Sequence, residues 1–160
     1  MPPYLLNNPR RAGLFANVAL LAVVTVALNA FLFSVGWAGT GAEAQRGIPV
    51  LPPDYVIGLV WVSLLALMGA ARWLYVRESG DAGWRSWMPF WLAAACLAYP
   101  FYTGGLQMGP AAFWGTVQIL VTVFVAIGVM RVRDPRSPWL LVPTACWGGF
   151  VVSAMLAYPR

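Results

Sequence analysis

The stretch 52-PPDYVIGLVWVSLLALMGAAR-72 carries the strongest fold signal in the chain. Two prolines followed by Asp54 are typical of a helix start, because a carboxylate there can accept hydrogen bonds from the first free amides. No charged residue follows until Arg72. At ~1.5 Å per residue, this apolar run nearly crosses a ~30 Å hydrocarbon core. The stretch therefore predicts a transmembrane helix.

Two sequence blocks resemble one known family. The pattern PPxYVxGxVWxxLxxLMGxA in the stretch above resembles the second-helix motif of the tryptophan-rich sensory protein (TspO) family, the relatives of the mitochondrial translocator or peripheral benzodiazepine receptor. The block 140-LLVPTACW-147 is similar to that family's fifth-helix motif, LLVPYxxW. The resemblance implies an all-α membrane protein, a five-transmembrane-helix bundle of TspO type, of which this chain is a divergent member.

The composition points the same way. Hydrophobic residues make up 61% of the 160 residues and charged residues 9%, which leaves too little polar surface for a soluble protein. We expect one transmembrane domain over residues 1–160. The net charge of +5 comes with no basic block interleaved with aromatics, so no nucleic-acid partner is expected. Histidine is absent and both cysteines lie in apolar runs, so no metal site is predicted.

Five apolar stretches predict helices over about residues 12–35, 54–76, 86–102, 110–130 and 138–158. The first could be mistaken for a signal peptide with a cleavage site at 42–44, but its apolar run is about twice as long as a signal sequence requires. We expect it to be retained. The link 36–53 is rich in glycine and proline, which favours a shaped, functional loop, with a surface connector as the alternative. The resemblance implies that it covers the ligand-binding end.

The arginines predict the orientation. Eight of the ten lie in the N-terminal arm or in and beside the links that follow the second and fourth helices, and the opposite side has Arg46 and Arg160. By the positive-inside rule, the N-terminus is cytoplasmic and the C-terminus periplasmic. The predicted location is a bacterial inner membrane, cytoplasmic or intracytoplasmic, which the chain crosses several times.

Five of the nine tryptophans lie near predicted helix ends, whereas Trp61 and Trp147 lie further inside their helices. Trp61 is about 10 Å and Trp147 about 16 Å from the outer ends of their helices, so both belong to the outer half of the bundle. Two large flat side chains at that level could wall a slot for a flat apolar ligand, a tetrapyrrole, carotenoid or sterol. Core packing is the alternative.

The resemblance extends the predicted ligand-binding set. It implies that Trp61 and Trp147 line the pocket, and the family motifs add Pro143, Tyr55 and Tyr99, which stands where the family has a tryptophan. Other pocket positions differ from the family: Cys96 replaces an asparagine, Gln118 an aspartate, Thr144 a tyrosine and Met155 an asparagine. Fewer polar groups favour either a more apolar ligand or a bundle that is kept for packing.

A stripe of small residues recurs every fourth position in the last helix: Ala145, Gly149, Ser153 and Ala157. Such a stripe lets another helix approach closely, either within the chain or from another protein. No enzyme is predicted, because all five acidic residues lie in loops or at helix ends and no imidazole is available.

Two functions remain open at this point. The first is a TspO-like sensory, regulatory or carrier protein that binds a flat apolar ligand. The second is a non-catalytic structural or assembly subunit of a larger membrane complex, for which the resemblance favours a bacterial photosynthetic pigment-protein complex. No cofactor is certain; a tetrapyrrole or a carotenoid is the class that the resemblance implies. Expected partners are the lipid bilayer and either a second copy or other membrane subunits.

Overall fold

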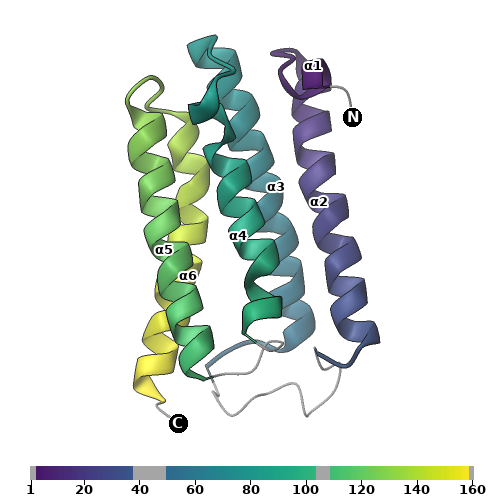
Figure 1. Cartoon of the computed structure of the whole chain (residues 1–160), viewed down its shortest axis with the longest axis vertical. Helices are drawn as coiled ribbons and strands as arrows, with labels where there is room; N and C mark the ends of the chain where they lie inside the picture. The colour runs from purple at the N-terminus through teal and green to yellow at the C-terminus, as the bar shows by residue number, and fades with distance from the viewer. Residues whose placement is uncertain (1–2, 38–49, 104–108, 159–160) are drawn as a thin grey trace.

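The computed structural model describes residues 3–37, 50–103 and 109–158, and these form a bundle of roughly parallel and antiparallel helices (Figure 1). The elements are α1 (Pro3–Leu6), α2 (Arg11–Ser34), α3 (Asp54–Ser79), η2 (Trp84–Trp87), α4 (Met88–Tyr102), α5 (Pro110–Arg131), η3 (Ser137–Leu141) and α6 (Val142–Ala157). No strand occurs in these ranges. The predicted all-α class is therefore confirmed.

Four helical segments are long and apolar enough to cross a membrane: Arg11–Ser34, Asp54–Ser79, Pro110–Arg131 and Ser137–Ala157. The chain is thus a multi-pass membrane protein. The remaining predicted span, 86–102, corresponds to η2 and the 15-residue helix α4. Figure 1 shows α4 between its neighbours, running along the bundle with α3 and α5. Residues 38–49 of the predicted loop lie outside the described residues.

Two predicted helices begin differently from the sequence prediction. A 3₁₀ segment precedes both α4 and α6, and a proline, Pro89 or Pro143, is the second residue of each α-helix. Proline has no N–H, so the carbonyl four residues earlier cannot receive an α-helical hydrogen bond. The preceding amide donates three residues back instead, as Met88 does to the carbonyl of Arg85. The predicted continuous helix 138–158 is therefore two segments with different hydrogen bonding.

The core runs along α3, where Leu65, Met68, Ala71 and Tyr75 are fully or almost fully buried. Close contact between α2 and α3 depends on Gly69, because a Cβ at that position would lie 2.5 Å from the carbonyl oxygen of Asn17. Substitution by any larger residue would therefore separate the two helices.

The environment of Arg72 differs from what its position in the sequence suggests. Its place near the end of α3 is typical of an interfacial anchor. In the structure its side chain is completely buried, and its guanidinium donates to the Leu6 carbonyl at 2.6 Å, to Asn17 Oδ1 at 2.9 Å and to Asn7 Oδ1 at 2.6 Å. The ring of Trp87 lies 4.0 Å from the guanidinium carbon. Arg72 therefore holds the N-terminal arm against the bundle.

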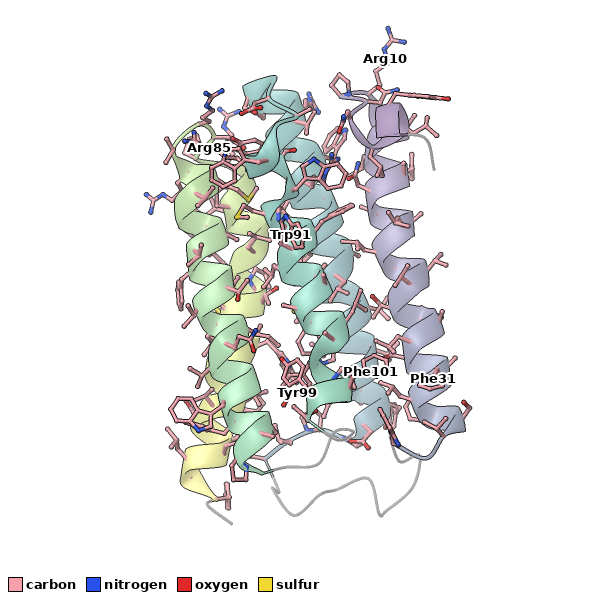
Figure 2. All side chains as sticks on the ribbon, in the orientation of Figure 1. Arg10, Phe31, Arg85, Trp91, Tyr99 and Phe101 are labelled. Atoms are coloured by element: carbon pink, nitrogen blue, oxygen red, sulfur yellow. The ribbon has the colours of Figure 1, made fainter. Side chains whose placement is uncertain are left out.

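Charged residues gather at the end of the bundle that carries α1. Figure 2 shows Arg10 and Arg85 there, while Tyr99, Phe101 and Phe31 lie toward the opposite end. Two ion pairs connect the C-terminal end of α3 and the link after it to the link after α5: Arg136 with Glu78 at 3.5 Å and Arg133 with Asp81 at 3.2 Å. The described parts of the chain thus have one basic end and one largely uncharged end.

Candidate functional site

A cavity lies among α3, α4, α5 and α6, toward the uncharged end of the bundle. It encloses about 630 Å³ of space between atoms, the open mouth included. Its wall is mostly apolar, and the lining residues are Leu51, Asp54, Ile57, Trp61, Tyr99, Thr116, Ile119, Thr144, Trp147, Gly148 and Val151.

The helical repeat explains why α6 contributes four of these residues. Thr144, Trp147, Gly148 and Val151 follow the spacing i, i+3, i+4, i+7, which places them on one face of the helix. At ~1.5 Å per residue, this face extends about 10 Å along the cavity. Val151 is nearer the uncharged end, so Thr144 marks the deep end. Gly148 keeps the face close to α5, because a Cβ there would lie 2.9 Å from Leu120 Cδ2.

The structure brings Trp61 and Trp147 to the same cavity from opposite helices. Asp54, Ile57 and Trp61 form the corresponding stripe on α3, with spacing i, i+3, i+7. Trp61 also packs against the main core, so it belongs to both the core and the cavity wall. The two roles considered for this tryptophan, core packing and lining a ligand cavity, are therefore compatible.

Tyr99 reaches the cavity from α4, and Figure 2 shows it near the uncharged end of the bundle. Its hydroxyl lies 3.2 Å from the Ala112 carbonyl oxygen and 3.4 Å from Thr116 Oγ1, and Thr116 itself donates to Ala112 at 2.8 Å. These bonds occupy the donors of both hydroxyls. Thr144 is 1% exposed, and its hydroxyl has no hydrogen-bond partner in the described protein.

A second cavity of about 510 Å³, open mouth included, lies among α2, α3 and α4. Four residues line both cavities: Asp54, Ile57, Trp61 and Tyr99. These side chains form the partition between the two spaces. Cys96, which replaces the family's asparagine, lines the second cavity and is not among the residues that line the first cavity.

The other predicted site residues lie elsewhere. Tyr55 is 53% exposed, Pro143 is also exposed, and neither is among the residues that line the two cavities. In the small-residue stripe, Ala145 packs against the core. Ser153 and Ala157 face outward, and a Cβ added at Gly149 would meet nothing within 4 Å.

The sequence prediction did not include several lining residues, among them Ile57, Thr116, Ile119 and Val151. The helical stripes through Trp61 and Trp147 could have identified those on α3 and α6. Thr116 carries no such signal, because the rotation of α5 about its axis depends on packing. Within the described ranges, no group of three or more histidine, cysteine or acidic residues could hold a metal.

Comparison with known proteins identifies the family of this chain. The profile of the TspO/MBR family matches residues 18–158, which is most of the chain. The chain belongs to the TspO/MBR family. It is 30% identical over 118 residues to the translocator protein of sheep, Ovis aries. That alignment covers 69% of this chain and 66% of the sheep protein, just under two thirds of the relative's length. No solved structure gives a significant match.

Proposed function

We propose that this TspO/MBR-family protein binds a flat or elongated apolar ligand in the cavity among α3, α4, α5 and α6, in a sensory, regulatory or carrier role. The observation that supports it most is that Trp61 and Trp147, which come from different helices, line the same mostly apolar cavity. Indole rings give large, flat contact surfaces to ligands such as tetrapyrroles, carotenoids and sterols.

The proposal includes the topology and the location. The segment η2–α4 crosses the membrane in addition to the four long helical segments, which gives five crossings in all. It has this role because α4 has no charged residue and lies beside α3 and α5 (Figure 1). The basic end faces the cytoplasm of a bacterium and the cavity opens toward the periplasmic side of the inner membrane. The role is non-catalytic, since the cavity wall contains one carboxylate, Asp54, and no imidazole.

Binding can be tested with purified protein in lipid nanodiscs and a panel of one metal-free porphyrin, one carotenoid and one sterol. Affinity is followed by each ligand's absorbance or by retention of radiolabel, so that the readout does not depend on protein tryptophans. The double variant Trp61→Phe with Trp147→Phe should weaken the binding of the accepted ligand roughly tenfold.

The matched control is Trp91→Phe with Trp114→Phe, since both of these tryptophans are 66% exposed and neither is among the cavity-lining residues. It should keep the wild-type affinity. Failure of every ligand to bind, or equal losses in the two double variants, would refute the proposed cavity.

The second candidate is a structural or assembly subunit of a larger membrane complex, such as a photosynthetic pigment-protein complex. The outward-facing part of the small-residue stripe, Gly149, Ser153 and Ala157, favours it, because such a surface allows close helix contact. Extraction from native membranes in mild detergent separates the two. A particle of one or two chains supports the receptor, and a large pigment-bearing particle supports the subunit.

A further inference from the structure

The hydroxyl of Thr144 differs from most helical serine and threonine hydroxyls among the described residues; the buried Ser137 hydroxyl in η3 is the other one that has no hydrogen-bond partner. In seven cases a serine or threonine donates to the carbonyl four residues earlier, at 2.6 to 3.0 Å: Thr25, Ser63, Ser79, Thr103, Thr116, Thr122 and Ser153. Thr144 makes no such bond, although it is 1% exposed. Buried polar groups are normally paired, so this exception requires an explanation.

The local backbone explains why Thr144 lacks the usual acceptor. Four residues before it is Leu140, which belongs to the 3₁₀ segment η3. The hydroxyl makes no bond to the Leu140 carbonyl, at the point where the i→i+3 bonding of the 3₁₀ turn changes to the i→i+4 bonding of α6. Thr144 is the third residue of α6. The change in helix type thus frees one donor beside the cavity.

The position of Thr144 indicates what it could bind. Thr144 lies at the deep end of the lining face of α6, farther than Trp147 from the uncharged end of the bundle, in a wall that is otherwise mostly apolar. The other two lining hydroxyls, on Tyr99 and Thr116, already donate within the protein. A ligand oxygen that reaches the deep end would therefore meet one uncommitted donor and no positively charged side chain among the lining residues.

From these observations we propose that Thr144 is a specificity residue that donates a hydrogen bond to one neutral oxygen, a hydroxyl or carbonyl, at the inner end of an apolar ligand. This inference rests on the proposed function, because it concerns the same cavity. It narrows the ligand class to molecules with a flat or elongated hydrocarbon body and an uncharged oxygen at one end. A ligand with a carboxylate at that end would lose its hydration without gaining a cation.

The test uses two flat probes of nearly equal shape, 1-pyrenemethanol and 1-methylpyrene, which differ by one hydroxyl. Binding to the full chain in nanodiscs is followed by energy transfer from protein tryptophan to pyrene. Wild-type protein should bind the alcohol roughly three- to tenfold more tightly than the hydrocarbon, relative to the partition of each probe into empty nanodiscs.

The isosteric variant Thr144→Val should remove this preference, and a cooperative thermal unfolding transition in the same nanodiscs shows that the variant is folded. The conservative variant Thr144→Ser keeps a hydroxyl and should restore most of the preference. Equal preference for the alcohol in wild type and Thr144→Val would overturn the inference while the cavity itself remains. Binding of neither probe above the empty nanodiscs would refute the cavity and, with it, the role of Thr144.

Discussion

Replacement of Arg72 by leucine should release the N-terminal arm and destabilise the protein. The guanidinium makes three hydrogen bonds of 2.6 to 2.9 Å to the arm and to α2, and its carbon lies 4.0 Å from the Trp87 ring. Hydrogen bonds from a charged donor contribute about 1.5–3 kcal/mol each, and removing the charge recovers part of its desolvation cost. We therefore expect a net loss of about 2–4 kcal/mol in the free energy of unfolding.

Two assays follow from this structure. Thermal unfolding in detergent, followed by tryptophan emission, should show a decrease of about 6–12 °C in Tm for Arg72→Leu. Limited trypsin digestion should cut faster at Arg10 or Arg11, because the Arg10 carbonyl is held by the Trp73 indole in the same region. Loss of the first ten or eleven residues is read by mass spectrometry.

The control is Arg77→Leu, five residues further along α3. The Arg77 side chain is 54% exposed, and its ion pair with Glu78 is long, at 3.7 Å. An exposed pair of this kind contributes at most about 1 kcal/mol, so both readouts should stay close to wild type. If Arg72→Leu behaves like Arg77→Leu in Tm and in cleavage of the arm, the proposed role of the buried network is wrong.

Three further substitutions test the packing. Gly69→Ala should lower Tm, because its Cβ would lie 2.5 Å from a carbonyl oxygen of α2. The Cβ of Gly128→Ala would meet nothing within 4 Å, so this variant should be neutral or slightly stabilising. Equal Tm values for the two variants would refute the close α2–α3 contact. Asp81→Asn removes a partly exposed ion pair of 3.2 Å and should lower the free energy of unfolding by less than about 1 kcal/mol. At high salt the ion pair is screened, so the Tm of the variant should equal that of the wild type. A decrease in Tm that persists at high salt would contradict this role of the ion pair. Tyr99→Phe removes a hydroxyl bonded within the wall and should cost about 1 kcal/mol in thermal unfolding, and an unchanged Tm would argue against those bonds.

Much of the fold could be predicted because its signals are local. Long apolar runs, prolines near helix starts and arginines beside the links predict the helices to within a few residues. The 3₁₀ segments before Met88 and Val142 were not predicted, because apolar runs and helix-start signals do not distinguish 3₁₀ from α-helical hydrogen bonding. In both cases the proline is the second α-helical residue, and its missing N–H changes the hydrogen bonding of the turn before it.

Arg72 could not be interpreted correctly from hydropathy, which treats each segment by itself. Its partners, Leu6, Asn7 and Asn17, are more than 50 residues away in sequence. Asn17 in the middle of an apolar run was a signal that a polar partner would be buried there. The identity of that partner depends on how the N-terminal arm folds back, and no local pattern contains this information.

The candidate site could be predicted in part, because some of its residues stand in local sequence motifs. Trp61, Trp147 and Tyr99 were expected from their depth and from the family motifs, and the structure brings all three to one cavity. Tyr55 and Pro143 stand in the same motifs, yet the rotation of their helices turns both outward. Thr144 stood out in the sequence solely as a departure from the family. Its free hydroxyl becomes visible when the 3₁₀ segment before it is known.

The most direct test of the central claim is photocrosslinking of a pyrene that carries a diazirine to the protein in nanodiscs, followed by peptide mapping. Excess 1-pyrenemethanol serves as the competitor, so that adducts from lipid-dissolved probe can be subtracted. If the ligand binds in the cavity among α3, α4, α5 and α6, the competed adducts will lie within residues 54–61 and 144–151. Competed adducts confined to outward-facing residues such as Trp91 and Phe124, or no competition at all, would contradict the account.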